Sequence, residues 1–401
     1  MLTGWAHFAR KFQQYYQQSR LWTPPQISNR EWMFIPFGGS PPIRHIGFHR
    51  IQDVRNYVSS KTMHSCFYST AYWNKPNETK MVDKEWQGAD LIFDLDGDHL
   101  PGITDNDFPS MIDIIQEQAW SLWNDFLEPE FGFSEEYLQV TFSGHRGFHL
   151  HYRDPSFHHL DSEARREIVS HIRGEGVDVA GGLSRFSNQD SKGWTNRLKN
   201  GMSELIDTLV SIDTNQENAN IELKRLEAGI KAMHEREPIQ SQRSAQSIQK
   251  LAQTLNHPNK IERLKNESKF EVLGKYQELF LNLLKSDTSI VLGNAGETDE
   301  VVTIDVRRQI RWPSSLHGKS GMRVTEFQLS QLDPDSSHRF HPLDECYVFG
   351  MEKNQRVEII KEDIHAKIGS QWIEATEGDI VETSESGATF LVLKGWGQQI
   401  Q

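Results

Sequence analysis

A short apolar run that ends in two alternating aspartates most constrains what this chain can fold into. Residues 89–95 read ADLIFDL, which is typical of a β-strand buried on both faces. Asp94 and Asp96 are two residues apart, so an extended strand points both carboxylates to one face. Such carboxylates repel each other unless a cation neutralises them. This is the geometry that hard divalent ions such as Mg²⁺ or Mn²⁺ require, but an Asp-x-Asp pair taken alone is more often a polar strand end entering a turn.

The segment that begins near Asp94 can be compared with two other known motifs, of which one is excluded and one is similar. An EF-hand is excluded, because position 6 counted from Asp94 is His99 rather than Gly and position 12 is Asp105 rather than Glu. The stretch FDLDG also resembles the nucleophile loop of haloacid-dehalogenase-type phosphatases. Those enzymes have Thr at the position that Asp98 occupies here, so this chain departs from their pattern.

The composition of the chain excludes several classes of protein. The chain has 401 residues and a net charge of −13, so it lacks the basic character of many nucleic-acid-binding proteins. An acidic protein can still hold a basic channel. Two cysteines exclude a disulfide framework and a zinc site built on several thiolates. No uninterrupted apolar stretch is long enough to span a membrane, and the N-terminus lacks the apolar core of a secretory signal, so we expect a cytoplasmic protein without a membrane partner.

A second motif, VTFSGHRGFHLH at residues 140–151, predicts two strands around a glycine-bearing turn. Glycines let the backbone approach a ligand closely. Ser143, His145, Arg146 and His149 supply hydroxyl, imidazole and guanidinium donors within seven residues. Such a set suits an oligophosphate, with the Arg fork adding two parallel hydrogen bonds, although a plain hairpin with a surface Arg is also compatible.

A third motif is the most basic window of this acidic chain, at residues 301–324. Asp305 lies in a β-like run, VVTIDV. The cationic residues that follow it are Arg307, Arg308, Arg311, His317, Lys319 and Arg323. A solvated surface would explain the cations alone, but a carboxylate inside a strand followed by cations favours a site. Three carboxylates and two cationic loops together predict two-metal phosphoryl or nucleotidyl transfer. They do not separate a polymerase from a nucleotidyltransferase or a hydrolase.

The periodicity of the chain predicts a mixed α+β fold. Helices are expected over residues 1–24, 110–127 and 161–173, and strands over 30–48 (a hairpin), 64–73, 89–95, 137–142 and 147–152. Polar segments with helical spacing fill 184–289, and β-like stretches return in VVTIDV, RQIRW, MRVTEF, YVFGM, RVEII and ATFLVLKG. We therefore expect three parts: a catalytic core at 1–183, a helical insert at 184–289, and the rest of the core at 290–401.

These motifs, in this order, resemble the small catalytic subunit of the archaeal and eukaryotic type of DNA primase. The stretches that carry the resemblance are REWMFIPFGG with PPIRHIGF, ADLIFDLDGDH, FSGHRGFHLH and DVRRQIRWPSSLHGKSGMRV. The resemblance spans roughly residues 30–183 and 290–400. It implies a primase-polymerase fold, which is a mixed core with a catalytic sheet plus a variable helical subdomain.

The resemblance also implies roles for individual residues. Asp94, Asp96 and Asp305 would be catalytic carboxylates that hold two Mg²⁺ or Mn²⁺ ions. The residues expected to bind the nucleotide are Ser143, His145, Arg146, His149, Arg311, His317 and Arg44. Of these, Arg44 belongs with Glu31 to the first motif, near the active site. Many archaeal relatives carry a Cys/His zinc knuckle between the second and third of these stretches, but residues 100–140 contain neither Cys nor His, so no structural zinc is expected.

The resemblance implies a primase that makes short RNA primers on single-stranded DNA from nucleoside triphosphates, with DNA primers left open. It implies a heterodimer with a large, iron–sulfur-containing subunit. Two alternatives remain at this point. One is a haloacid-dehalogenase-like phosphatase, which leaves the SGHRGFH motif unexplained, and the other is a non-catalytic nucleic-acid-binding subunit.

Overall fold

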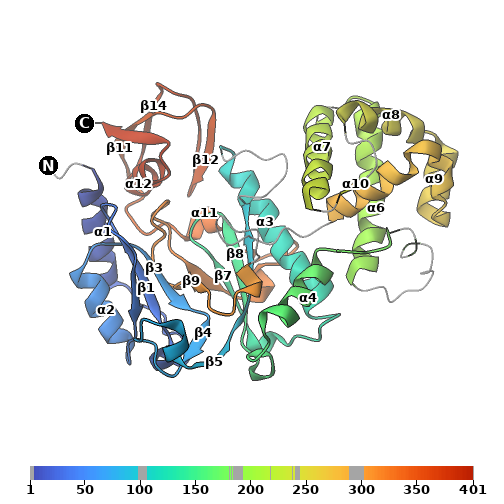
Figure 1. Ribbon diagram of the computed structural model, residues 1–401. Helices are drawn as coiled ribbons and strands as arrows, with labels where there is room; N and C mark the ends of the chain where they lie inside the picture. Colours follow the sequence, from blue (N-terminus) through green and yellow to red (C-terminus); the bar gives the residue numbers. More distant parts are fainter. Residues whose placement is uncertain are drawn as a thin grey trace.

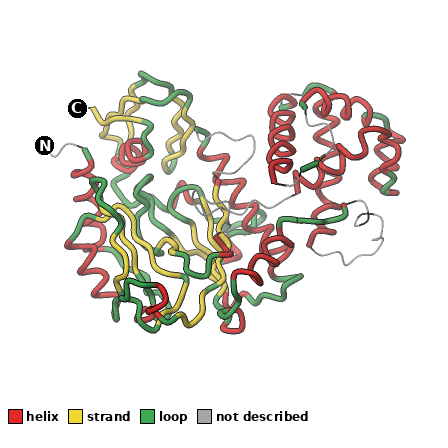
Figure 2. Tube along the Cα trace, viewed as in Figure 1, coloured by secondary structure: helices red, strands yellow, loops and turns green. Residues whose placement is uncertain are grey.

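The computed structural model describes residues 4–97, 106–179, 193–216, 218–236, 244–288 and 302–400, together with residues 181, 183, 238 and 239. Helices and strands are mixed along the chain, as the α+β prediction requires. Figure 2 shows strands in the middle of one lobe with helices outside them, and a second lobe made of helices. Within the described residues, no helix is both long enough and apolar enough to cross a bilayer.

The first sheet has the strand order β2-β1-β3-β9, with every pair antiparallel. Its strands are β1 (Trp32–Pro36), β2 (Ile43–Ile46), β3 (Met63–Ser69) and β9 (Gln309–Arg311). Helices α1 (Trp5–Gln18) and α2 (Ile51–Ser60) pack on each other beside this sheet (Figure 1). Their apolar side chains, such as Phe12 and Val54, share a core with Trp32 and Trp312. The hairpin predicted over 30–48 is confirmed as β1 and β2.

The second sheet has the order β10-β7-β8-β6, again antiparallel. Its strands are β6 (Leu91–Asp96), β7 (Leu138–Phe142), β8 (Gly147–Tyr152) and β10 (Thr325–Phe327), and α3 (Phe108–Leu122) packs on β6 and β8. Phe93 and Leu95 lie in the core with α3, whereas Ile92 lies in the core of the first sheet. The prediction of a strand buried on both faces is therefore confirmed.

The helices between residues 193 and 288 pack mainly on one another (Figure 1). They are α6 (Gly193–Asp213), α7 (Ala219–Arg236), α8 (Ala245–Leu255), α9 (Pro258–Glu267) and α10 (Gln277–Thr288). Trp194 of α6 meets Phe126 of the π-helical turn Trp123–Leu127 that follows α3, with ring centroids 5.8 Å apart. The boundaries expected near residues 184 and 289, and Asp98 of the phosphatase-like loop, lie outside the described residues.

The remaining elements complete the core lobe. They are α4 (Ser162–Ile172), β4 (Ala71–Trp73), β5 (Trp86–Ala89), α11 (Pro342–Glu345), β11 (Lys353–Ile359), β12 (Ile364–Ile368), β13 (Gln371–Ala375), β14 (Ile380–Ser384), α12 (Glu385–Leu393) and β15 (Gly397–Ile400). The C-terminal strands form a β14-β11-β15 sheet and a β12-β13 hairpin. The strand expected over 64–73 is divided into β3 and β4.

Three strand predictions in the last third are wrong. Residues 302–304 form a short 3₁₀ helix, η8, which packs on β6 and α4. Residues 347–351 form no strand, and Val348 and Phe349 are apolar because they pack against the first sheet's core. ATFLVLKG lies largely in α12, where the Ser384 hydroxyl accepts a hydrogen bond from the Gly387 N–H and caps the helix. A short buried apolar run does not distinguish helix from strand by periodicity, which explains the last error.

Candidate active site

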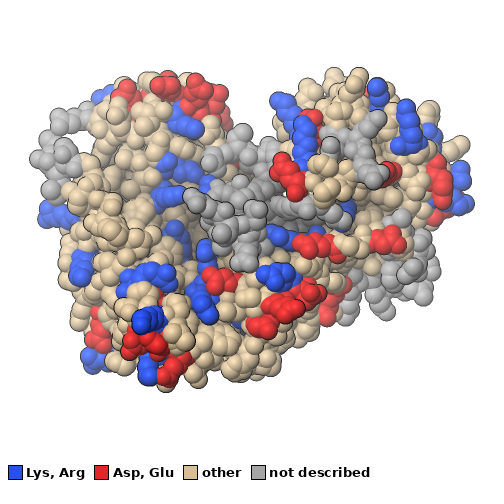
Figure 3. Space-filling model, viewed as in Figure 1, with Lys and Arg blue, Asp and Glu red and all other residues tan. Residues whose placement is uncertain are grey.

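A cleft of about 230 Å³ lies between the two sheets. It is lined by Phe67, Asp94, Asp96, Ser143, His145, Arg146, His149, Arg308, Gln309, Ile310, Arg311, His317 and Lys319. Eight of the ten residues predicted from the sequence therefore meet here, from segments more than 200 residues apart. In Figure 3, blue Lys and Arg atoms are seen in the middle of the lobe that holds the sheets.

The two aspartates line the cleft because they lie at the end of β6, on the face that turns toward the first sheet. Asp94 pairs with His149 in the β6–β8 register, and its Oδ1 is 3.3 Å from His149 Nε2. Asp96 Oδ1 accepts a hydrogen bond from Arg146 Nε at 3.1 Å. Burial raises the pKa of Asp94, but His149, Arg308 and Arg311 more than offset this and hold the pKa below its usual value. Asp94 is therefore an ionised carboxylate, which is the form that binds a cation.

The turn between β7 and β8 brings backbone and side-chain donors to the same cleft. The Ser143 hydroxyl accepts from the Gly147 N–H at 3.0 Å, which closes the turn. Gly144 has φ = 81°, and a Cβ at this position would lie 2.9 Å from Cβ of His317. Glycine is therefore required for the turn to approach the loop that carries His317.

Several buried polar atoms around the cleft have no partner within the described residues. They are Arg308 Nε, one terminal nitrogen of Arg311, both side-chain polar atoms of Gln309, and His149 Nδ1. Buried donors without a partner are costly, so such a group indicates a ligand. Burial lowers the pKa of Arg311 to about 10, so this guanidinium is still a cation at neutral pH. The donor set is suited to a polyanion.

Two histidines stack at the back of the cleft. The rings of His145 and His317 are 4.8 Å apart and 17° from parallel. Burial and nearby cations place the pKa of each well below its usual value, so both rings are neutral at neutral pH. His317 Nδ1 accepts from the Lys319 N–H at 3.1 Å, and this fixes the ring proton on Nε2.

Two predicted residues do not line this cleft. Asp305 follows η8 and is half-buried, and its Oδ1 accepts from the Arg307 N–H at 2.8 Å. In the described part of the chain, no three His, Cys, Asp or Glu side chains gather into a metal site. Arg44 Nε lies 3.4 Å from the carboxylate of the buried Glu31, which also approaches Lys84 at 3.4 Å. Both expected roles stay predictions.

The sequence interpretation left five lining residues unassigned. Arg308 and Lys319 belong to the basic window but carry no predicted role. Phe67 and Ile310 are apolar members of β3 and β9, and Gln309 had no distinguishing signal. Side chains alternate between the two faces of a strand, and Gln309 lies two residues before Arg311 in β9. Its position on the same strand face as Arg311 could therefore have indicated Gln309.

Known protein sequences match nearly the whole chain. A family described as DNA primase small subunit matches residues 93–329. The DNA primase small subunit PriS of Methanothrix thermoacetophila is 33% identical, over 97% of this chain and 97% of that protein. The proteins of the same name from Methanococcoides burtonii (30% identical, 96% of each chain) and Picrophilus torridus (32%, 80% of each chain) are also similar.

Proposed function

The chain belongs to the DNA primase small subunit family and is a catalytic primase subunit, and from that premise we propose that it transfers nucleotides in the cleft between its two sheets. One observation carries this proposal. Two carboxylates on one strand face share a cleft with cationic side chains, and buried polar atoms of His149, Gln309 and Arg311 there have no partner within the described residues. Neither the phosphatase alternative nor the non-catalytic alternative finds support among the relatives.

The residues of the cleft fit two divalent ions when a triphosphate is present. Mg²⁺ is normally held by one or two carboxylates together with substrate phosphates, so Asp94 and Asp96 are proposed as the first two protein ligands. Asp305 is proposed as a third ligand, because η8 packs on β6. When bound, the ions (Mg²⁺ or Mn²⁺) activate the attacking hydroxyl and stabilise the leaving pyrophosphate.

The chain's own residues hold the incoming nucleotide. Arg146 and Arg311 supply guanidinium groups for the phosphates, and Ser143, His145, His149 and His317 supply hydroxyl and imidazole groups beside them. The cleft of about 230 Å³ is smaller than the ~300–1,000 Å³ of sites that enclose a whole small molecule, so it suits the triphosphate end, with base and ribose outside. Fixing the phosphates in line with the attacking hydroxyl lowers the barrier through orientation and preorganised charge. Arg44, paired with the buried Glu31, is proposed to act at the edge of the site.

The assembly proposed for this chain is a heterodimer with a primase large subunit. PriS denotes a small subunit in the relatives, which implies a large one. We propose that the large subunit carries the iron–sulfur cluster and helps to bind the first nucleotide, and that single-stranded DNA is the template.

Primer synthesis by Asp94→Asn and Asp96→Asn tests the proposal. Each variant should lose about a hundredfold or more of nucleotide incorporation, because bound metal contributes several kcal/mol to the transition state. The assay uses single-stranded DNA, labelled nucleoside triphosphates and Mg²⁺ or Mn²⁺, with and without a supplied primer. Asp83→Asn is the matched control, since Asp83 is exposed on a short helix outside the cleft.

The outcomes are distinct. Extension of a supplied primer, without initiation by this chain alone, would assign initiation to the large subunit and keep polymerisation here. Incorporation by neither the chain nor the heterodimer would overturn the proposal. Release of phosphate from small esters, lost in Asp94→Asn, would instead support a phosphatase.

A further inference from the structure

Lys394 reaches the phosphate-binding turn from the end of the chain. Its Nζ lies 3.0 Å from Nε2 of His145, although Lys394 is 65 residues beyond the end of the family match at residue 329. A lysine ammonium only donates hydrogen bonds. The neutral His145 ring therefore accepts at Nε2 and carries its proton on Nδ1.

Lys394 is held in place by the C-terminal helix and by aromatic rings. It caps the C-terminus of α12, where its N–H donates to the Phe390 carbonyl at 2.8 Å. Its Nζ is 4.9 Å from the ring centroid of Phe108 and 5.2 Å from that of Trp396. Phe108 in turn contacts Phe390, with centroids 5.1 Å apart. Two ring faces favour a cation at this point, so the ammonium has a defined position behind the turn.

The other surroundings of His145 restrict its ring in the same way. One side stacks on His317, and Phe108 lies 5.5 Å away in a tilted arrangement. His145 is 5% exposed, yet it lines the cleft. With Nε2 occupied by Lys394, Nδ1 is the ring atom left to donate to another group.

We propose that Lys394 is a positioning residue for nucleotide binding because it fixes His145 as the Nδ1–H tautomer. Phosphate binding by His145 therefore depends on the placement of Lys394 by α12. This inference rests on the proposed nucleotide-binding role of His145. It adds a residue from the C-terminal segment to a site otherwise built from residues 67–319. It also gives the C-terminal sheet and α12 a functional link to the cleft.

The test compares Lys394→Met, Lys394→Arg and the exposed control Lys353→Met. Methionine keeps an unbranched chain between Phe108 and Trp396 but cannot donate. We expect Lys394→Met to raise the KM for nucleoside triphosphate about tenfold, as for one lost charge-assisted hydrogen bond, while kcat changes less than threefold. Lys394→Arg should bring the KM most of the way back to the wild-type value, and the KM of Lys353→Met should equal that of the wild type.

Ring-¹⁵N histidine NMR supplies a readout that packing alone would not move. In the wild type, Nε2 of His145 should have the shift of an unprotonated nitrogen, assigned with His145→Gln. In Lys394→Met the same nitrogen should move toward a mixture of tautomers. A wild-type proton on Nε2 would overturn the proposal without any Lys394 variant, so a misfolded variant does not leave it untested.

The two proposals fail in different ways. If the wild type binds no nucleoside triphosphate in an equilibrium titration, the proposed function itself is wrong. If the wild type binds and Lys394→Met binds equally well with an unchanged His145 spectrum, only the role of Lys394 is wrong.

Discussion

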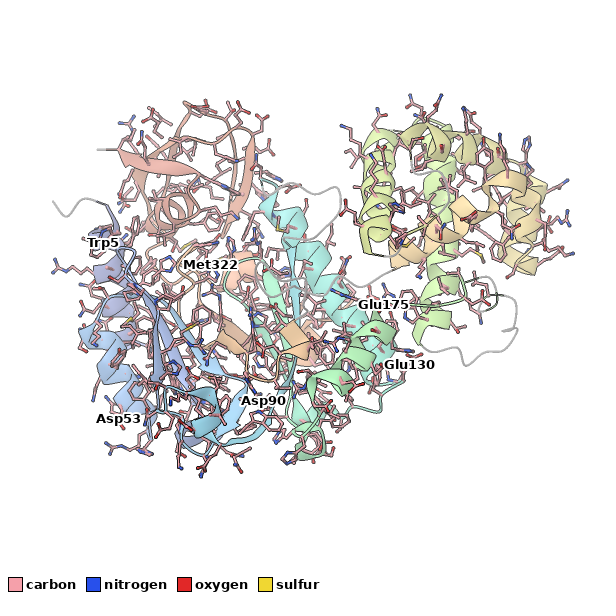
Figure 4. All side chains as sticks on the ribbon, viewed as in Figure 1. Trp5, Asp53, Asp90, Glu130, Glu175 and Met322 are labelled. Atoms are coloured by element: carbon pink, nitrogen blue, oxygen red, sulfur yellow. The ribbon has the colours of Figure 1, made fainter. Side chains whose placement is uncertain are left out.

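At the scale of single residues, Asp90 joins the two sheets that form the cleft. It lies immediately before β6 and is fully buried. Its carboxylate accepts from Arg30 at 3.0 Å, from the Tyr72 hydroxyl at 2.6 Å and from Arg153 at 3.2 Å. Arg30 precedes β1 of the first sheet and Arg153 follows β8 of the second, so one carboxylate connects both. Figure 4 labels Asp90 in the core lobe near β4 and β5.

Asp90→Asn should destabilise the fold by about 3–5 kcal/mol at pH 7, because it leaves the buried Arg30 and the half-buried Arg153 without their anion. Burial raises the pKa of Asp90, but Arg30 and Arg153 hold it below the usual value. A depressed carboxyl pKa adds stability above the unfolded-state value of about 3.9, and this stability is lost as the pH falls through the folded-state pKa. Urea unfolding should therefore show a gap between wild type and variant that narrows at acid pH.

The control for this prediction is Asp83→Asn, in which an exposed carboxyl is neutralised. A gap of the same size at pH 7 and at pH 3 would contradict the ionic origin of the effect. Nothing in the sequence indicated Asp90, because the two arginines that pair with it are 60 and 63 residues away along the chain. Asp94 and Asp96, by contrast, were predicted as a pair because their relation is local to one strand.

At the scale of elements, the turn at 143–147 determines how closely the two halves of the site approach. The Ser320 hydroxyl donates to the Gly144 carbonyl, so the turn and the 317–322 loop are joined directly. Figure 4 labels Met322, whose carbonyl would lie 3.1 Å from a Cβ on Gly144. The position thus combines a left-handed backbone with a close neighbour on the other segment.

Gly144→Ala should raise the KM for nucleoside triphosphate by about tenfold or more, because the turn must move away from His317. Gly132→Ala is the matched control: Gly132 also has a positive φ, 70°, but a Cβ there meets nothing within 4 Å. Both variants should lose about 1 kcal/mol or more of stability from the backbone strain, measured by thermal unfolding. Equal KM values for the two variants would contradict the role assigned to the close approach.

The elements that position the site were largely predictable from the sequence. β6, β7 and β8 follow from apolar runs separated by a glycine-bearing turn, and their side-chain period of two correctly places Asp94 and Asp96 on one face. The strand predictions failed at η8 and α12, because a short apolar segment is compatible with both the helical and the strand periodicity. Lys394 was also not predicted, because this residue at the end of α12 meets His145 of the β7–β8 turn across 249 residues.

At the scale of the whole molecule, the charge of the cleft is opposite to the net charge of the chain. The net charge is −13, yet the cleft is rich in cations. Figure 3 shows red Asp and Glu atoms over the C-terminal strands at the top of the core lobe, whereas blue atoms lie lower, in its middle. A polyanionic template is repelled by the first surface and attracted by the second.

The chain alone should therefore bind single-stranded DNA weakly, with an affinity that falls as salt is raised. Each neutralised phosphate contributes about −0.7 to the slope of log K against log salt concentration for a single strand. The measured slope therefore gives the number of phosphate contacts. Fluorescence anisotropy with a labelled oligonucleotide at several salt concentrations measures it, and the heterodimer with the large subunit should bind more tightly under every condition. Tight binding by the chain alone that is insensitive to salt would contradict the prediction, since it would require a template surface that does not depend on the few cations of the cleft.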